Sequence, residues 1–167
     1  MKNKSTQRVL GIDPGARYTG YVVLDGKELI HYGVKTLKKQ RPVQRLETEV
    51  KKEFKYMIKR FQPDVVVIEA LLIREYENWC NLGIVTSGIK SIAKQNGIEV
   101  IEYSPKDVRK HICNTGRATK LQAAKMLVQY YPELSSYLDG NYKRQQLYWL
   151  HVFDSLGVAW MYLDEKT

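Results

Sequence analysis

Residues 8–26 read RVLGIDPGARYTGYVVLDG, and this stretch indicates how the fold begins. An apolar run ends in the carboxylate of Asp13, which precedes a Pro-Gly turn, and a second apolar run follows at 21–24. The pattern predicts strands at 8–13 and 18–24. A carboxylate at the inner end of a buried strand loses hydration, so it needs a cation, hydrogen bonds or a proton. The rest of the sequence must supply that partner.

Length, composition and charge narrow the class of protein. A chain of 167 residues with 44% hydrophobic side chains is long enough for a single domain, 1–167, that needs no disulfide or metal to stabilise its core. No apolar stretch approaches the ~20 residues of a membrane span, and the first apolar run is too short for a signal peptide. The net charge of +9 favours a nucleic-acid partner, although an ordinary solvated basic surface would also explain it.

The two cysteines argue for a reducing compartment. Cys80 and Cys113 are far apart and belong to no CxxC pair, which argues against a zinc site. We expect reduced thiols and a cytoplasmic protein.

The remaining chain alternates between strand and helix patterns. Asp25-Gly26 is a hairpin signal before a third strand at 28–36. Apolar residues spaced three and four apart over 43–61 predict an amphipathic helix with a lysine-rich, solvated outer face. The β-branched run VVVIE at 65–69 predicts a central strand buried on both faces. Further along we expect a helix at 79–95, a strand at 98–103, a turn at 114–116, and helices at 105–112, 118–131 and 143–163. This order predicts an α/β fold, a mixed sheet with helices on both faces.

Four side chains are candidates for one site. Asp13 ends the first strand and Glu69 ends the fourth, so the two carboxylates meet if those strands are neighbours. In the last predicted helix, His151 and Asp154 are three residues apart and share a face. Three carboxylates and an imidazole suit Mg²⁺ or Mn²⁺ better than softer metals. Two such ions support phosphodiester hydrolysis.

Each of these residues also has an ordinary structural interpretation. Asp13 could cap its turn, and Glu69 could pair with a nearby arginine or lysine. His151 could be a hydrogen-bonded core histidine, and Asp154 could accept a hydrogen bond from a tryptophan. Taken together at these strand ends and this helix spacing, the four residues favour the metal site.

The sequence resembles the RuvC-type Holliday junction resolvases, crossover junction endodeoxyribonucleases of the ribonuclease H-like superfamily. The resemblance rests on four blocks: GIDPGARYTGY at 11–21, RLETEVKKEFKYMIKRFQPDVVVIE at 45–69, YSPKDVRKHICNTGRATKLQ at 103–122, and DSLGVAW at 154–160. It implies a ribonuclease H-like fold with a five-stranded mixed sheet. It also implies a homodimer that resolves four-way DNA junctions by symmetric paired nicks, with a branch-migration helicase complex as a candidate further partner.

By this resemblance, particular residues take on roles. Asp13, Glu69, His151 and Asp154 stand at the catalytic, metal-binding positions, where two Mg²⁺ ions are expected and Mn²⁺ should substitute. Arg109 and Lys120 stand at positions that contact DNA. Lys106 and Arg117 complete a basic block near the predicted helix start at Ala118, where backbone N–H groups also favour phosphate.

The chain departs from the family pattern at three places. His151 stands where Asp is common, and Asn114 stands where we expect Gly. Leu72 replaces the aromatic residue that wedges open the crossover in many members, which puts that step in doubt. We take Leu72 and Tyr76 as DNA-contact candidates; Ile73, Tyr76 and Trp79 are the alternatives for the wedge.

Several alternatives stay open. The same fold could act on other branched DNA or on structured RNA. The GIDPG stretch also resembles the phosphate loop of actin-like and Hsp70-like ATPases, but those proteins need two such domains and a longer chain. Gly15 and Gly20 could allow close approach of a phosphate or simply form tight turns. A dimer could form through Leu82, Ile89 and Ile92 of the 79–95 helix, although core packing explains these residues equally well.

Overall fold

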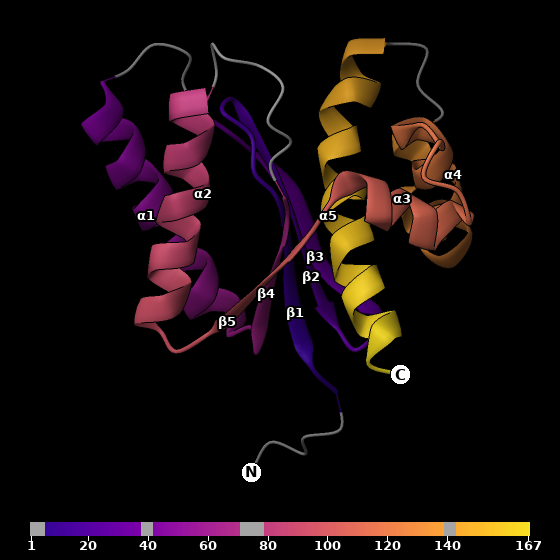
Figure 1. The fold of residues 1–167 in the computed structure, drawn as a ribbon, viewed down its shortest axis with the longest axis horizontal. Coiled ribbons are helices and arrows are strands. Elements are labelled where there is room, and N and C mark those ends of the chain that lie inside the picture. The colour runs from indigo at the N-terminus through magenta and orange to yellow at the C-terminus, as the bar shows by residue number, and fades with distance from the viewer. Residues whose placement is uncertain (1–5, 38–41, 71–78, 139–142) are drawn as a thin grey trace.

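The computed structural model describes residues 6–37, 42–70, 79–138 and 143–167. These residues form a mixed sheet with helices on both faces, the α/β fold predicted from the sequence (Figure 1). The strands are β1 (Arg8–Asp13), β2 (Tyr18–Asp25), β3 (Glu28–Thr36), β4 (Val65–Glu69) and β5 (Glu99–Tyr103). The helices are α1 (Val43–Phe61), α2 (Trp79–Gln95), α3 (Pro105–Cys113), α4 (Lys120–Tyr130), α5 (Lys143–Glu165) and a short 3₁₀ helix, η1 (Pro132–Tyr137).

The strand order brings the ends of β1 and β4 together. The five strands lie in the order β3-β2-β1-β4-β5. β1 pairs antiparallel with β2 and parallel with β4, and β4 pairs parallel with β5. In the β1–β4 pair, Ile12 stands opposite Ile68. The next residue in each strand, Asp13 and Glu69, therefore ends its strand at the same edge of the sheet.

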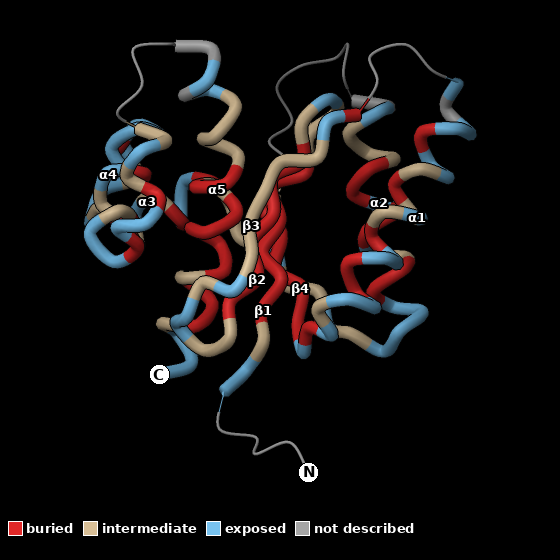
Figure 2. The backbone as a smooth tube through the Cα atoms, turned by 180° about the vertical axis from the view of Figure 1, so that it is seen from behind, coloured by how far each residue is buried: buried red, intermediate tan, exposed pale blue. Residues whose placement is uncertain are grey.

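The alternation of side chains along each strand decides which face these acids occupy. Leu10 and Ile12 pack into the core beneath α1 and α2, whereas Val9 packs into the core beneath α5. The same alternation holds in β4, where Val65 and Val67 belong to the α5 side. Asp13 and Glu69 have the parity of the α5 side, so both point toward that helix. Figure 2 shows the central strands buried between the two helical layers.

The face covered by α1 and α2 is an apolar core that includes two residues considered for a dimer contact. Ile89 and Ile92 of α2 are only 2% and 5% exposed, packed with Phe54 and Met57 of α1. The proposed dimer contact through Ile89 and Ile92 is therefore wrong, because both side chains already pack in the core of their own chain. Leu82 is half-buried.

Helix ends agree with local capping chemistry. Ser104 accepts a hydrogen bond from the Asp107 amide at the start of α3. Thr119 and Gln122 form a reciprocal capping box, so α4 begins at Lys120 rather than at the predicted 118. Asn114 ends α3 with a left-handed φ of 57°, a conformation that Asn tolerates better than most residues, which explains why Gly is not required there.

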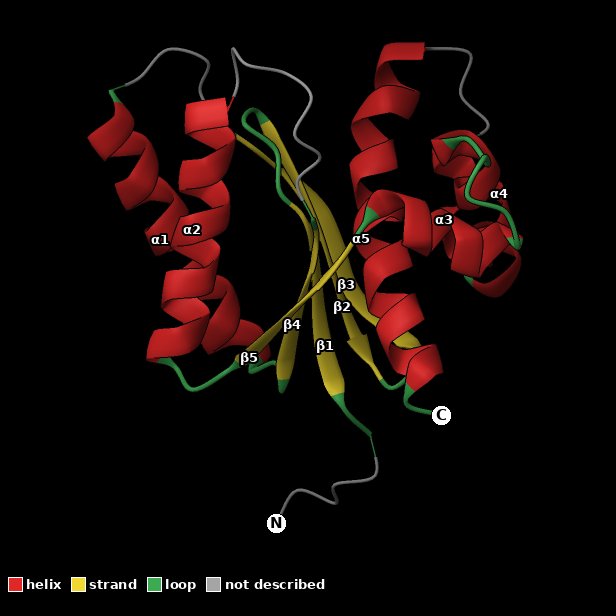
Figure 3. Cartoon of the chain, in the orientation of Figure 1, coloured by secondary structure: helices red, strands yellow, loops and turns green. Residues whose placement is uncertain are grey.

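Most predicted elements match the observed ones within two residues (Figure 3). The bounds of the first strand and of the 43–61, 65–69 and 79–95 elements are as predicted. The sequence analysis did not predict η1, a 3₁₀ helix of six residues that follows α4 at Pro132. Among the described residues, no helix has the length and apolar character needed to cross a bilayer.

Candidate active site

Three carboxylates from three elements converge at one edge of the sheet. Asp13 of β1, Glu69 of β4 and Asp154 of α5 each present an oxygen, and these atoms lie within 4.8 Å of one another. Asp13 and Glu69 are 7% and 8% exposed, so water screens their charges little. Within the described part of the chain, this is the group of acidic, histidine or cysteine side chains close enough to hold a metal ion.

Two glycines allow α5 to lie close to the strands that carry the acids. A Cβ atom at Gly20 would lie 2.0 Å from the carbonyl oxygen of His151, and one at Gly11 would lie 2.3 Å from the carbonyl oxygen of Ser155. No L side chain fits at either distance, so both positions require glycine. At Gly15 a Cβ would lie 1.9 Å from the Tyr18 carbonyl oxygen, which agrees with the tight-turn interpretation of that residue.

A buried hydroxyl then fixes β1 against α5. Ser155 is fully buried, and its Oγ accepts a hydrogen bond from the Asp13 amide at 3.1 Å. The same hydroxyl donates to the carbonyl oxygen of His151 at 2.7 Å. One side chain thereby holds the strand end that carries Asp13 in register with the helix turn that carries His151 and Asp154.

Burial and mutual repulsion make the acids hard to ionise together. Burial, followed by the charges of Asp154 and Asp13, raises the pKa of Glu69 to about 9. Burial and the charge of Asp13 also raise the pKa of Asp154 to about 6, against the opposing effect of Lys120. A divalent cation would relieve this repulsion, so the cluster has the oxygen chemistry and the charge deficit of a site for a hard metal ion.

His151 contacts the cluster through one acid. Its Nδ1 lies 2.6 Å from Oδ2 of Asp13. The group of ligand atoms within 4.8 Å of one another consists of oxygens from Asp13, Glu69 and Asp154 and does not include the imidazole. The structure thus brings the predicted histidine to the site as a neighbour of Asp13, and its role as a metal ligand stays a prediction.

Lys120 reaches further into the site than the sequence indicated. Its ammonium group forms an ion pair with Asp154, and its side chain keeps 46% exposure. Burial lowers the pKa of Lys120, but the charges of Asp154, Glu69 and Asp13 outweigh that effect and raise it above the usual value. The sequence carried a partial signal, because the capping box fixes Lys120 as the first residue of α4.

The other DNA-contact candidates lie on α3 and the turn that follows it, on the α5 side of the sheet (Figure 1). Lys106 and Arg117 are exposed, and Arg109 is half-buried. Leu72, Tyr76 and the alternative Ile73 lie outside the described residues. Trp79 begins α2.

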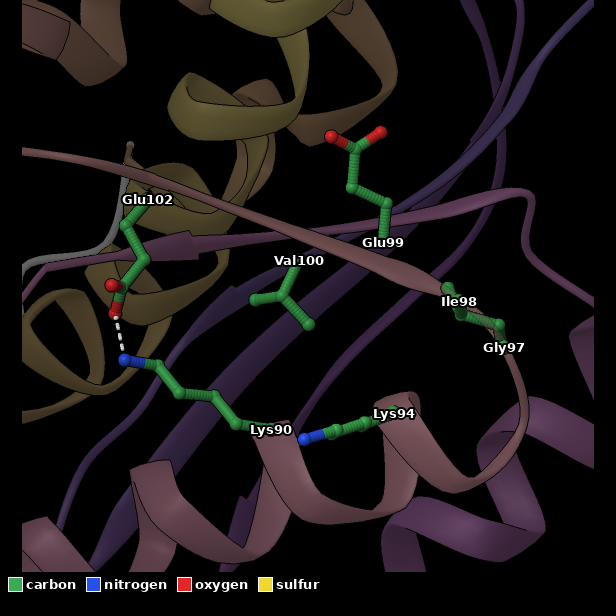
Figure 4. Close-up of a pocket in the computed structure, with 7 residues that line it drawn as sticks. All are labelled: Lys90, Lys94, Gly97, Ile98, Glu99, Val100 and Glu102. Atoms are coloured by element: carbon green, nitrogen blue, oxygen red, sulfur yellow. Dashed lines mark ion pairs between the residues drawn. The ribbon is translucent and has the colours of Figure 1, made fainter.

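A surface hollow between α2 and β5 differs in character from the acid cluster. Lys90, Lys94, Glu99 and Glu102 are among the residues that line it. Lys90 Nζ lies 2.8 Å from Glu102 Oε1, and Glu99 points away from both lysines (Figure 4). The charged side chains that line this hollow are of both signs, and one of its acids, Glu102, is paired with a lysine. The hollow therefore offers no cluster of acids comparable to the candidate metal site.

Comparisons with known proteins agree with this geometry. The family model described as "Crossover junction endodeoxyribonuclease RuvC" matches residues 9–137. The protein of that name from Caldicellulosiruptor saccharolyticus is 35% identical over 130 residues, which cover 72% of this chain and 76% of the relative. Its counterpart from Thermomicrobium roseum is 32% identical over 124 residues, with the same two coverages.

Solved structures share the fold. The T. thermophilus RuvC in complex with Holliday junction substrate matches with a TM-score of 0.72 and 21% identity, covering 92% of this chain and 90% of that one. The yeast mitochondrial Holliday junction resolvase Ydc2 also matches with a TM-score of 0.72, at 17% identity, over 96% of this chain and 80% of that one. The predicted ribonuclease H-like fold is confirmed. Because the family model spans most of the chain and the sequence relatives agree with it, this chain belongs to the RuvC family of crossover junction endodeoxyribonucleases.

Proposed function

We propose that this chain is a structure-selective endonuclease that resolves four-way DNA junctions by symmetric paired nicks, through phosphodiester hydrolysis with two divalent metal ions. The observation that carries the proposal is the convergence of Asp13, Glu69 and Asp154, buried beside Lys120, in a member of the RuvC family. We infer that residues 1–167 act as one nuclease domain, since α5 supplies Asp154 to a site whose other acids lie in the sheet.

The donor set fits magnesium. All three clustered ligands are carboxylates, and Mg²⁺ prefers oxygen; Mn²⁺ accepts the same donors and should substitute. When bound, two such ions stabilise the attacking and leaving oxygens of an in-line displacement at phosphorus. The chain's own part is to hold three acids at the end of a rigid sheet.

His151 and Lys120 would act at the two sides of this cluster. With Nδ1 of His151 engaged by Asp13, Nε2 is the ring nitrogen left to bind metal or accept a proton from the attacking water. The imidazole must be neutral for either role. Lys120, at Asp154, would contribute positive charge toward the bound phosphate.

The basic residues of α3, of the turn that follows it and of the start of α4 would supply a DNA surface. Lys106, Arg109, Arg117 and Lys120 lie on the side of the sheet that carries the acid cluster. Each phosphate neutralised by such a residue should contribute about 0.9 to the slope of log affinity against log salt. We expect Arg109→Ala and Lys120→Ala each to flatten that slope; an unchanged slope in both variants would remove this surface from the DNA interface.

Two symmetric nicks require two active sites, so we propose a homodimer. Because Ile89 and Ile92 pack in the core of their own chain, the dimer contact must use other residues. Light scattering with and without junction DNA checks this: a monomer in both states would contradict the proposal. A branch-migration helicase complex as a further partner, and a cytoplasmic location, rest on the family and on the free thiol of Cys113.

A cleavage assay with matched substrates tests the central proposal. We expect the protein with Mg²⁺ to nick a synthetic mobile four-way junction at symmetric positions and to leave duplex DNA and structured RNA intact. Asp154→Asn is the control that should bind the junction without nicking it. Equal or faster cutting of RNA or of other branched DNA would instead favour the alternative substrates.

A further inference from the structure

A row of aromatic side chains leads away from the acid cluster. The ring of Tyr18 lies 5.9 Å from the ring of His151, which contacts Asp13. The ring of Tyr148 lies 5.3 Å from that of Tyr18, nearly edge-on at 81°. Tyr148 precedes His151 by three residues on α5, so the two share a helix face. The row therefore starts at the proposed metal site and runs toward the beginning of α5.

Tyr18 is held firmly in this row. It is the first residue of β2, where its backbone pairs with Thr36 of β3. Its neighbour Tyr148 is anchored in turn, because the Tyr148 hydroxyl donates to the Val34 carbonyl oxygen at 3.2 Å. An aromatic ring fixed in this way loses little conformational entropy when a ligand packs on it.

Arg17 completes the arrangement. This exposed residue places its guanidinium 5.0 Å from the centroid of the Tyr18 ring. A guanidinium offers a fork of donors that matches phosphate and a plane on which a base can stack. Arg17 and the half-buried Tyr18 together present the groups that bind an unpaired nucleotide.

The charges around the acid cluster indicate where such a nucleotide would lie. A chain of contacts runs from Arg17 through Tyr18 and His151 to Asp13, and Lys120 contacts the acid cluster at Asp154. A DNA strand that enters the site would therefore have these two cations available to bind its phosphates.

We propose that Arg17 and Tyr18 bind the deoxynucleotide next to the scissile phosphate, with its phosphate on Arg17 and its unstacked base on the ring of Tyr18, which Tyr148 supports edge-on. This inference rests on the proposed junction nuclease. It assigns a substrate contact to the α5 side of the site, made by residues that the sequence analysis did not single out.

The experiment measures binding in a form of the protein that cannot cut. In an Asp154→Asn background, a four-way junction carries 2-aminopurine beside the mapped nick site, where stacking on a ring quenches its fluorescence. Tyr18→Leu removes the ring and Tyr18→Phe keeps it. Tyr130→Leu is the matched control. Tyr130 lies ten residues beyond Lys120, at the end of α4; it is 59% exposed, and its ring lies 5.3 Å from that of Trp160 at a tilt of 38°.

We expect Tyr18→Leu to abolish the quenching and to weaken junction binding by about 5- to 150-fold. Tyr18→Phe and Tyr130→Leu should behave like the parent, and Arg17→Gln should reduce the salt slope of binding by about 1. If Tyr18→Leu retains the quenching and binds within twofold of the parent, the contact does not exist. A lower nicking rate for Tyr18→Leu in the otherwise unmodified protein, with unchanged binding, would also overturn it and reveal a residue that only positions His151. Failure of the unmodified protein to nick any junction would instead count against the proposed function.

Discussion

The two faces of the sheet are packed by different means. Beneath α1 and α2, large apolar side chains such as Phe54 and Met57 meet Ile12, and a cavity of about 40 Å³ remains among them. Beneath α5, Gly11 and Gly20 bring the helix backbone almost onto the strands. The first face buries mostly apolar side chains, whereas the second brings together two buried carboxylates and a partly buried one beside a histidine and a lysine. The close approach of α5 therefore brings His151 and Asp154 to the acids that end β1 and β4, on a face that also has an apolar core of its own.

The largest contrast should come from removing one acid. Asp154→Asn takes a ligand from the proposed metal site, so we expect nicking to fall by about 10⁴-fold or more while junction binding persists. Met57→Leu on the opposite face is the control and should leave nicking unchanged. Gel-based cleavage and mobility-shift assays measure both effects. Loss of binding in step with cleavage would mean that Asp154 is structural.

His151 tests whether the α5 face needs an imidazole or only a neighbour for Asp13. We expect His151→Ala to lower nicking by about 10²- to 10⁴-fold if the ring takes part in proton transfer. His151→Asp supplies the residue common in the family and should retain substantial activity. Nicking rates and melting temperatures of both variants test this role of His151. A stable, fully active His151→Ala protein would show that the residue takes no part in the site.

Gly20 tests the close approach itself. In Gly20→Ala the new methyl group would overlap the His151 carbonyl, so α5 must shift away from β2. We expect a loss of about 1–3 kcal/mol in the free energy of unfolding and a clear drop in nicking. Ile89→Val on the other face should cost about 0.5–1.5 kcal/mol and leave nicking alone. Denaturant unfolding with cleavage rates compares the two; equal activity in both variants would refute a functional need for the close packing.

The last prediction concerns the stability of the metal-free protein as a function of pH. The pKa of Glu69 is raised from 4.5 to about 9, so the folded state binds this proton more tightly than the unfolded chain does. The stabilisation from Glu69 is complete below about pH 4.5 and is lost as pH rises through about 9. The pKa of Asp154 is also raised, from 3.8 to about 6, so its contribution to stability is lost at lower pH, as the pH rises through about 6.

We therefore expect the melting temperature of the metal-free protein to fall between pH 5 and pH 9, by roughly 2–4 °C per kcal/mol lost. Glu69→Gln should flatten this dependence, and excess Mg²⁺ should reduce it because metal binds the ionised carboxylates. Calorimetric melting in chelator and in Mg²⁺ measures the effect. A melting temperature that rises with pH in chelator would show that the acids are not under mutual strain.

Much of the site was predictable because strand geometry is local. The sequence places Asp13 and Glu69 at the ends of two predicted strands, and the three-residue spacing in α5 puts His151 and Asp154 on one helix face. Helix and strand bounds followed from apolar periodicity and turn residues, except at η1, where a short 3₁₀ segment carries no such period.

What the tertiary structure decided are the contacts between elements far apart in the chain. Sequence alone determined the order of elements, the placement of Asp13 and Glu69 at strand ends and the family resemblance, because these depend on neighbouring residues. It could not determine that Ile89 and Ile92 face their own core, that Lys120 reaches Asp154, or that Tyr18 packs against His151. The first of these depends on how α2 packs against the sheet, and the second on how α4 packs against α5. The third depends on the distance between α5 and the sheet, which Gly11, Gly20 and Ser155 set only once the whole fold has formed.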